Sequence, residues 1–465
     1  MAEIRDDEAA RDDTRPLSRG VLLAYGLPGL PLALVPTALV VFVPDLYARE
    51  MGLGLATTGI VLMLARIVAM ATSPLLGAVS DRMVLPLGRR RPWLVLMLPL
   101  VLLASDKVLM PARGVGPVYL AIWLSLLYGG LTLMDVSHGA WGAELSGAYH
   151  QRTRIFGARA LGTLLGILLA ATTPALLRLS PPGHWLGTGP VATGETLFLA
   201  FAGVLPLTLA MLLGAVPEPR DLSVRQPRWR RSLRLLIIGN RPLVALLGAA
   251  LFNGLANGIP AALFLLYVTQ VLGAGNRAGL LLGLAGMAAL LSLPLWVWLA
   301  GHFGKRHVWI AAMIGAAGVL ATVPFIGFND VRLFAAVCVL GGAASAADLV
   351  LPPALLADVV DRDCLTGGEQ RAGLLFGLLS LTGRLAPAVA VGLVFPVLAL
   401  LGIDANGDDS TTGGRLGLAV LFGLAPALFK AAAIALIWDF PLDAERQRAI
   451  RRRLERRAAR AGAET

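Results

Sequence analysis

The sequence predicts an all-α membrane protein in which about twelve transmembrane helices form two pseudo-symmetric six-helix bundles. Three observations predict it. First, the 465 residues are 57% hydrophobic and only 15% charged, whereas a water-soluble domain carries roughly 25% charged residues. Second, apolar runs long enough to cross a bilayer recur along the whole chain. Third, a basic loop between two such runs occurs once in each half.

The apolar runs predict the positions of the spans. A transmembrane helix needs about 20 mostly apolar residues, and a helix is forced because the bilayer core offers no water to the backbone. We expect spans at 20–45, 55–79, 93–111, 117–143, 155–178, 195–216, 243–271, 277–300, 308–328, 332–357, 373–402 and 415–438.

The two basic loops indicate an internal duplication. The first, residues 77–93, contains Asp81, Arg82 and Arg89, and the second is residues 301–307 with Lys305. Each follows a proline of the preceding span by a similar step. Duplicated membrane bundles are typical of proteins that move solutes.

The net charge of +11 is a topology signal. Lys and Arg gather in alternate loops, which is the positive-inside pattern, so no nucleic-acid partner is expected. The pattern predicts a multi-pass protein of the cell inner membrane with both termini cytoplasmic. Residues 1–16 are acidic and polar without an apolar core, so they predict a cytoplasmic tail and no signal peptide.

These signals divide the chain into five parts. We expect a cytoplasmic N-terminal tail at 1–19, a first bundle at 20–217, a basic cytoplasmic linker at 218–242, a second bundle at 243–438 and a basic cytoplasmic tail at 439–465. The last tail predicts either a short helix lying on the anionic inner leaflet or a solvated charged helix. We expect a monomer.

Acids and arginines repeat between the halves in a second pattern. In each half an acid lies within a span, a second acid follows about ten residues later, and a basic loop comes next. These residues are Asp135, Glu144 and Arg154 in the first half and Asp348, Asp358 and Arg371 in the second. The pattern predicts gating ion pairs that break and re-form, and topology anchoring is the alternative.

Several short motifs occur in a distinctive order. They are Asp81-Arg82 leading to Gly88-Arg-Arg-Arg-Pro-Trp93, Leu-Met-Asp135 leading to Glu144-Leu-Ser, Arg152-Thr-Arg154, Arg159, Ala-Asp358-Val-Val-Asp361, Arg371-Ala-Gly and Arg384. On these residues the chain resembles the glycoside–pentoside–hexuronide:cation symporter family of the major facilitator superfamily. The resemblance covers nearly the whole membrane region and implies alternating access to a central solute site. It also implies that Asp81, Arg82, Arg89 and Asp361 belong to the cytoplasmic gate.

One departure from that family concerns the coupling cation. The family carries two aspartates on its second span, and the matching positions here are Ala69 and Ser73. Hydroxyl groups supply dipoles without the full negative charge that offsets dehydration of sodium. A proton is therefore the favoured coupling ion, with Asp135 or Asp348 as its carrier and His138 as a relay. Asp135 staying paired, His138 only bonding within the span, and uncoupled facilitation remain open.

Ionisable residues inside the spans predict the solute path, because charges in the bilayer are costly and usually face the protein interior. They are Arg66, Asp135, Arg159, Asp348 and Arg384. The resemblance implies that Asp135 and Arg159 contact a sugar and that Arg384 replaces a lysine of the family. Further candidates are Trp141 as an aromatic platform, and Asn253 with Asn257 as solute ligands or helix–helix contacts.

The charge balance adds a hypothesis about the solute. Without the two span-2 aspartates, Arg66 lacks a partner, which an anionic solute such as a uronide would supply. The alternative is that Arg66 pairs with Asp135 and the solute is neutral. An exporter of a non-sugar solute, a sensor or a lipid-moving protein also remain possible readings. No His-Glu-x-x-His motif or nucleophile elbow occurs, so we expect no enzyme, no metal site and no cofactor.

Overall fold

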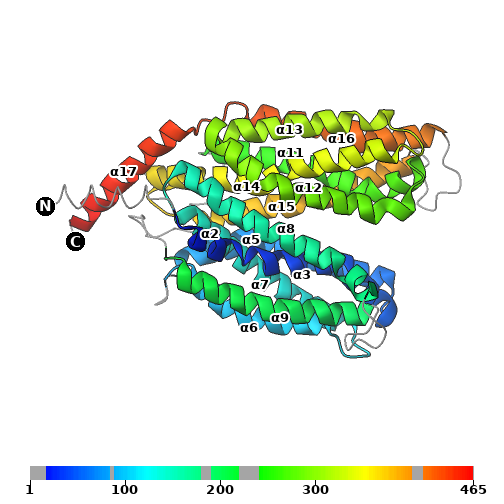
Figure 1. The fold of residues 1–465 in the computed structure, drawn as a ribbon. Coiled ribbons are helices and arrows are strands. Elements are labelled where there is room, and N and C mark those ends of the chain that lie inside the picture. The colour runs from blue at the N-terminus through cyan, green and yellow to red at the C-terminus, as the bar shows by residue number, and fades with distance from the viewer. Residues whose placement is uncertain (1–16, 84–87, 180–189, 219–239, 401–411, 464–465) are drawn as a thin grey trace. The chain divides into compact units, whose positions relative to one another are not determined.

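The computed structural model describes residues 17–83, 88–179, 190–218, 240–400 and 412–463, and Figure 1 shows the fold. The described part of the chain is helical almost throughout. Its principal helices are α2 (Arg19–Gly26), α3 (Gly29–Val41), α4 (Val43–Asp45), α5 (Leu55–Arg82), α6 (Arg91–Leu109), α7 (Pro117–Glu144), α8 (Tyr149–Leu179), α9 (Pro190–Ala215), α11 (Arg241–Leu266), α12 (Ala278–Phe303), α13 (Lys305–Ala321), α14 (Val331–Gly367), α15 (Ala372–Leu400), α16 (Thr412–Ile437) and α17 (Ala444–Ala463).

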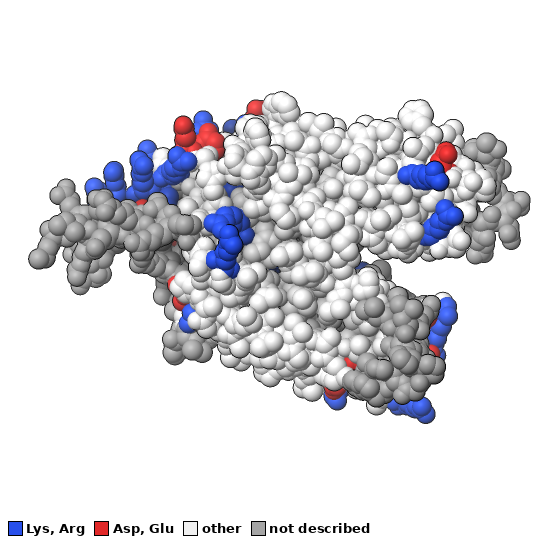
Figure 2. Space-filling model, viewed as in Figure 1, with Lys and Arg blue, Asp and Glu red and all other residues white. Residues whose placement is uncertain are grey.

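Twelve helical stretches among the described residues are long and apolar enough to cross a membrane, which confirms the predicted number. Figure 2 shows the matching surface, with few charges along the helices and most charges near their ends. The first span is made of two helices, because Pro28 lies between α2 and α3 and has no N–H to continue the helical ladder.

Among the spans that run past their predicted limits, two carry acids near their ends. The second was expected to end near residue 79 and ends at Arg82, while the tenth was expected to end near 357 and ends at Gly367. Hydropathy locates the point where charges begin, whereas a helix continues as long as its backbone ladder does. As a result, Asp81 and Asp358 lie on helices, where their side chains are held in register.

The chain forms two compact units. Unit 1 comprises residues 1–227, 360–378 and 450–465, and unit 2 comprises residues 228–359 and 379–449. Unit 1 thus includes residues 360–378, which lie within the predicted second bundle, and residues 450–465 of the predicted tail. The predicted linker 218–242 and the tail 1–19 lie almost entirely outside the described residues.

Small residues bring α2 and α8 together in unit 1. A Cβ atom at Gly26 would lie 2.4 Å from the carbonyl oxygen of Ala158, and one at Gly162 would lie 2.3 Å from that of Gly26. Small residues permit such backbone contact between membrane helices. This packing sets the position of α8, which carries Arg159. In unit 2, α11 and α13 both pack against α16.

Candidate functional site

An ion pair within the spans of unit 1 joins α7 to α8. Arg159 Nη2 lies 2.5 Å from Asp135 Oδ1 and also donates to the main-chain oxygen of Asp135 at 3.3 Å. The Asp135 side chain is 37% exposed and that of Arg159 is 16% exposed. Asp135 Oδ2 accepts no hydrogen bond from a described residue. The pair therefore retains capacity to accept and donate further hydrogen bonds.

Gly139 makes room for this pair. A Cβ atom at this position of α7 would lie 2.8 Å from Arg159 Nη1 and 2.7 Å from a ring carbon of Phe376. Both contacts are closer than real Cβ atoms make. The absence of a side chain thus allows the guanidinium to lie across α7 and reach the Asp135 carboxylate.

His138 is bound to α2. Its Nε2–H donates to the carbonyl oxygen of Tyr25 at 2.8 Å, and the Tyr25 hydroxyl donates to the His138 carbonyl oxygen at 2.9 Å. The imidazole is fully buried and lies 4.5 Å from the Tyr25 ring, centroid to centroid. These contacts favour the hydrogen-bonding alternative for His138, and its role as a proton relay stays a prediction.

Trp141 is packed inside unit 1. Its side chain is fully buried and donates from Nε1 to the carbonyl oxygen of Pro217 at 3.0 Å. The Arg91 guanidinium lies 5.8 Å from the ring centroid, within the range of a cation–π contact. The structure thus places Trp141 as an anchor for the end of α9, and its proposed stacking on a sugar gains no support.

Arg66 is exposed on α5. Its Nε donates to the Tyr128 hydroxyl at 3.3 Å, and no ion pair joins it to an acid in the part of the chain that the structure describes. Because Asp135 pairs with Arg159, the alternative of an Arg66–Asp135 pair is not what the structure shows. Arg384 is half-buried on α15.

The hydroxyl groups of α5 at the position of the family's span-2 acids bond to their own helix. Ser73 Oγ donates to the carbonyl oxygen of Ala69 at 2.8 Å, and Thr72 Oγ1 donates to that of Val68 at 2.8 Å. Such bonds to the preceding turn are an ordinary way to satisfy hydroxyls in helices. They give α5 no negative charge at this position.

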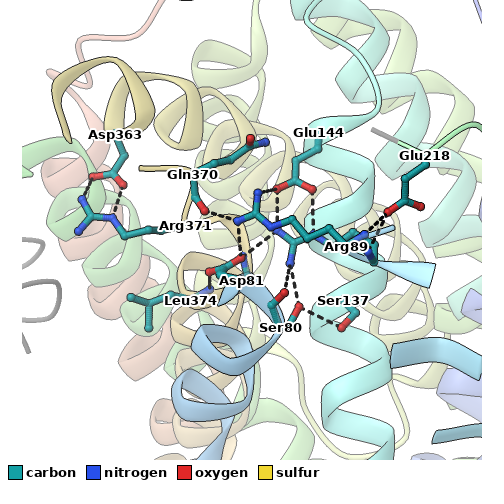
Figure 3. A network of polar contacts seen from close by, with 12 residues as sticks. Ser80, Asp81, Arg89, Ser137, Glu144, Glu218, Asp363, Gln370, Arg371 and Leu374 are labelled. Atoms are coloured by element: carbon teal, nitrogen blue, oxygen red, sulfur yellow. Dashed lines mark hydrogen bonds and ion pairs between the residues drawn. The ribbon is translucent and has the colours of Figure 1, made fainter. Parts of the chain in front are cut away.

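A second group of charges lies at the end of α5, and Figure 3 shows it. We call Asp81, Arg89, Arg90 and Glu144 the arginine–acid cluster. Arg90 is its centre and is fully buried. Its guanidinium donates to Glu144 Oε1 at 2.6 Å and Oε2 at 2.8 Å, and to Asp81 Oδ1 at 2.9 Å. Such bidentate, charge-assisted bonds are among the strongest that side chains make.

The electrostatics of Arg90 follow from these neighbours. Burial would lower the pKa of its guanidinium, but Glu144 and Asp81 outweigh burial and raise the pKa above its usual value. Arg90 therefore stays charged at every accessible pH. A buried charge of this kind is tolerated only with partners that remain in place.

Asp81 also caps α15. Its two carboxylate oxygens accept hydrogen bonds from the backbone N–H groups of Gly373 and Leu374, each at 2.8 Å. A carboxylate is stabilised there because the first N–H groups of a helix have no partner within the helix. Arg89 adds a bond to the carbonyl oxygen of Gln370. The cluster thus binds the segment 360–378 to α5 within unit 1.

The α5–α15 contact is close enough to exclude side chains. A Cβ atom at Gly77 would lie 2.1 Å from the carbonyl oxygen of Gly373, and one at Gly373 would lie 2.8 Å from Asp81 Oδ1. Both positions therefore require glycine while the contact exists.

The other predicted gate residues fall around this cluster. Asp361 pairs with Arg152, whose Nη2 lies 2.6 Å from Oδ2, and Arg371 pairs with Asp363 at 3.0 Å. Arg154 instead contacts Gln151 at 3.4 Å, so the inward-facing arginine at the start of α8 is the fully buried Arg152. Arg82 is exposed.

Unit 2 contains the counterparts of these pairs. Lys305, at the start of α13, donates to Asp358 Oδ2 at 2.7 Å, and both side chains are fully buried. Within the spans, Asp348 accepts from Asn257 Nδ2 at 2.7 Å and from Trp309 Nε1 at 2.8 Å. Asn257 thus contacts the carboxylate that the sequence singled out.

Sequence reasoning named Arg152 and Lys305 within basic motifs but gave them no site role, and it did not single out Arg90 or Lys430. Arg90 stands between two other arginines, and no periodicity shows which of the three points inward. Lys305 could have been found by aligning the two basic loops, because it begins the helix after its loop as Arg90 and Arg91 do in the first half. Lys430 was detectable as a cation in an apolar run.

Comparisons with known proteins agree with this architecture. The sequence model of a family described as MFS/sugar transport protein matches residues 24–444. The sodium-dependent lysophosphatidylcholine symporter 1 of Homo sapiens is 26% identical over 435 residues, covering 86% of this chain and 79% of that protein. The glucuronide carrier protein homolog of Escherichia coli K12 is 25% identical over 411 residues, covering 86% and 88%.

Solved structures show the same fold. The proton:xylose symporter XylE superposes with a TM-score of 0.67 at 18% identity, covering 91% of this chain and 95% of that chain. A bacterial homologue of the iron transporter ferroportin in an outward-facing state superposes with a TM-score of 0.66 at 17% identity, covering 90% and 99%. At these identities the likeness concerns the fold.

Proposed function

Because the chain belongs to the MFS/sugar transport protein family, and is thus a secondary transporter, we propose that its solute is a glycoside, with a hexuronide preferred. The observation that carries this proposal is the partly exposed Asp135–Arg159 pair. A carboxylate with a free oxygen accepts sugar hydroxyls, and a guanidinium donates to hydroxyls or to a carboxylate. The relation to a glucuronide carrier homolog supports the same class.

Arg66 supports the anionic member of that class. It is exposed, and among the described side chains it contacts a tyrosine hydroxyl and no acid. A guanidinium in a span without a carboxylate partner favours a solute that brings one. In this proposal Asp135 and Arg159 bind the sugar ring, and Arg66 selects the uronate.

We propose a proton as the coupling ion. The absence of a carboxylate at Ala69 and Ser73, together with the self-bonded Ser73 hydroxyl, leaves α5 without the charge that a sodium ion needs. Asp135 is the proposed proton carrier, because a proton on its carboxylate would weaken the bond to Arg159. Protonation of Asp135 would thereby free Arg159 to bind the solute, which couples proton binding to solute binding.

We propose that the arginine–acid cluster and the neighbouring pairs of Asp361 and Arg371 form the cytoplasmic gate. Alternating access requires contacts that part in one state and re-form in another. Asp81 suits this task, because it holds the first turn of α15 through hydrogen bonds alone. In this proposal the protein resides in the inner membrane as a monomer, with both termini in the cytoplasm. The solute crosses the membrane chemically unchanged.

A lysophospholipid is the second candidate solute. Several relatives are lysophosphatidylcholine symporters, and Arg66 lies on α5 among exposed apolar side chains, including Met63, Ile67 and Val68. A cationic head within an apolar flank would suit an amphiphile with a phosphate group.

Uptake into proteoliposomes tests these proposals. The purified protein is given methyl glucuronide, methyl glucoside or lysophosphatidylcholine, under a proton gradient or a sodium gradient. We expect proton-driven accumulation of the glucuronide, lost in Asp135→Asn. Accumulation driven only by sodium would overturn the coupling proposal, and uptake of only the lysolipid would replace the first solute class with the second.

A further inference from the structure

Lys430 is a buried cation that the transport proposal does not use. It lies in α16 and is 2% exposed. Its Nζ donates to Asn253 Oδ1 at 2.7 Å and to Asn257 Oδ1 at 2.9 Å. Both amides come from α11, one helical turn apart. Within the described ranges, Lys430 makes no ion pair with a carboxylate, so two neutral oxygens hold the ammonium directly.

The negative charge that compensates Lys430 is the Asp348 carboxylate, which Asn257 links to the ammonium. Asn257 donates from Nδ2 to Asp348 Oδ2 at 2.7 Å, while its Oδ1 accepts from Lys430. This amide therefore turns its oxygen to the cation and its amino group to the anion, which is the orientation that both hydrogen bonds require. Trp309 Nε1 donates to the other carboxylate oxygen at 2.8 Å and fixes the Asp348 side chain.

These side chains make a binding site for a monovalent cation. Two amide oxygens beside a carboxylate are the kind of oxygen ligands that hard cations take. Here the ammonium group of Lys430 occupies that site. It carries one positive charge, as sodium does, but its alkyl chain binds it covalently to α16.

We propose that Lys430 is a tethered cation, whose ammonium fills the site formed by the amide oxygens of Asn253 and Asn257 beside the Asp348 carboxylate, and thereby replaces a mobile sodium ion in unit 2. The binding site then needs no ion from solution. Charge neutrality around Asp348 is then built into the chain, and unit 2 is insensitive to sodium. This holds whichever solute the protein carries, so it goes beyond the proposed function.

Removal of the tethered cation tests this directly with sodium as the probe. The purified wild-type protein and Lys430→Ala are unfolded thermally in detergent, in sodium chloride and in choline chloride of equal ionic strength. We expect no difference for the wild type. We expect saturating sodium to raise the Tm of Lys430→Ala by about 3 °C or more, and this rise to vanish when Asp348→Asn is added.

Lys107→Ala is the matched control, because Lys107 is 41% exposed and pairs with Asp106 at the surface. It should show no sodium-specific shift. A Lys430→Ala protein whose Tm is equal in the two salts would overturn the proposal. So would a sodium-induced rise of the same size in the wild type, because the ion would then bind elsewhere.

A charge-balance cycle covers the case in which Lys430→Ala does not fold. Lys430→Met leaves Asp348 uncompensated, and Asp348→Asn leaves the ammonium uncompensated, so each should lower the Tm and the yield of folded protein. The double variant removes both charges and should recover part of the loss, because coupled charges are not additive. A double variant that loses at least the sum of the two single losses would contradict the proposal.

Discussion

The two acids within the spans, Asp135 in unit 1 and Asp348 in unit 2, occupy corresponding places in the two halves but are neutralised differently. Asp135 contacts a guanidinium directly at 2.5 Å, and it is partly exposed. Asp348 contacts the Asn257 amide and the Trp309 indole. Its cation, Lys430, contacts the oxygen of the same amide. A direct pair can be divided by a solute, whereas the half-buried Asp348 is joined to its cation only through the Asn257 amide.

The acids at the ends of the same helices differ less. Glu144 pairs with Arg90 in unit 1, and Asp358 pairs with Lys305 in unit 2, so each half joins the end of one span to the start of a neighbour. Arg90 also contacts Asp81 of α5, while Lys305 also donates to the carbonyl oxygen of Ala354. The duplication thus keeps the helix-end pair and varies the charges around it.

The largest expected effect comes from breaking the helix-end pairs. Arg90→Met should destabilise the protein by about 3–5 kcal/mol, because it removes the guanidinium that contacts both buried carboxylates, Asp81 and Glu144. Lys305→Met should cost less, since the lost ammonium contacts one buried carboxylate. Thermal unfolding in detergent measures both, with the exposed Arg82→Met as control, expected within about 1 kcal/mol. A larger loss for Lys305→Met would refute the ranking.

The pH dependence of that pair has a definite sign. The pKa of Arg90 is raised, so its contribution to stability is complete at every pH below the usual pKa of a guanidinium. It is lost only at higher pH, beyond the working range. Any loss of stability on alkalinisation to milder pH must therefore come from other groups.

The next largest effect separates the two acids within the spans. Asp135→Asn should lower methyl glucuronide exchange in proteoliposomes by about 100-fold, because removing one partner of a charged contact costs about 2–5 kcal/mol. Asp348→Asn should leave exchange by the folded fraction within about 10-fold, since its contacts are internal to unit 2. Equal losses in both variants would abolish the functional distinction between the acids.

A smaller effect is expected at His138, which lies one turn from Asp135 on α7. His138→Phe should destabilise unit 1 by about 1–3 kcal/mol, because the Tyr25 carbonyl oxygen loses its buried donor. The pH dependence of glucuronide uptake should stay unchanged. A shifted pH profile in a folded His138→Phe protein would restore the role of a proton relay. Tyr25→Phe is the matched control, because it removes the reciprocal bond and keeps the imidazole.

The smallest effect is expected at Arg66 and refines the proposal for the solute. Arg66→Gln should weaken methyl glucuronide affinity by about 10-fold, the equivalent of about 1.4 kcal/mol, and leave methyl glucoside unaffected. Competition of the two sugars against one labelled substrate measures both. An equal loss for both would show that Arg66 acts on the protein and not on the uronate.

Several features of the site were predictable from the sequence because they depend on composition along one segment. The twelve spans follow from apolar runs, and the acids Asp135 and Asp348 are visible as charges within them. The helix ends at Arg82 and Gly367 were not predicted, because hydropathy changes at the membrane surface and the backbone ladder does not. The sequence predicts Trp141 and His138 as site residues because they lie near Asp135 on the same helix, but packing gives both of them partners within unit 1.

By itself, the sequence determined the class of protein, the number of spans and the repeated placement of acids within and after them, since the bilayer imposes these through local hydrophobicity. Only the tertiary structure decided the partners. Asp135 takes Arg159 and not Arg66 because glycine at 139 lets that guanidinium cross α7, and Asn257 lies between Asp348 and Lys430 because α11, α14 and α16 meet there. Such contacts join residues far apart in the chain, and no local pattern encodes which of them meet.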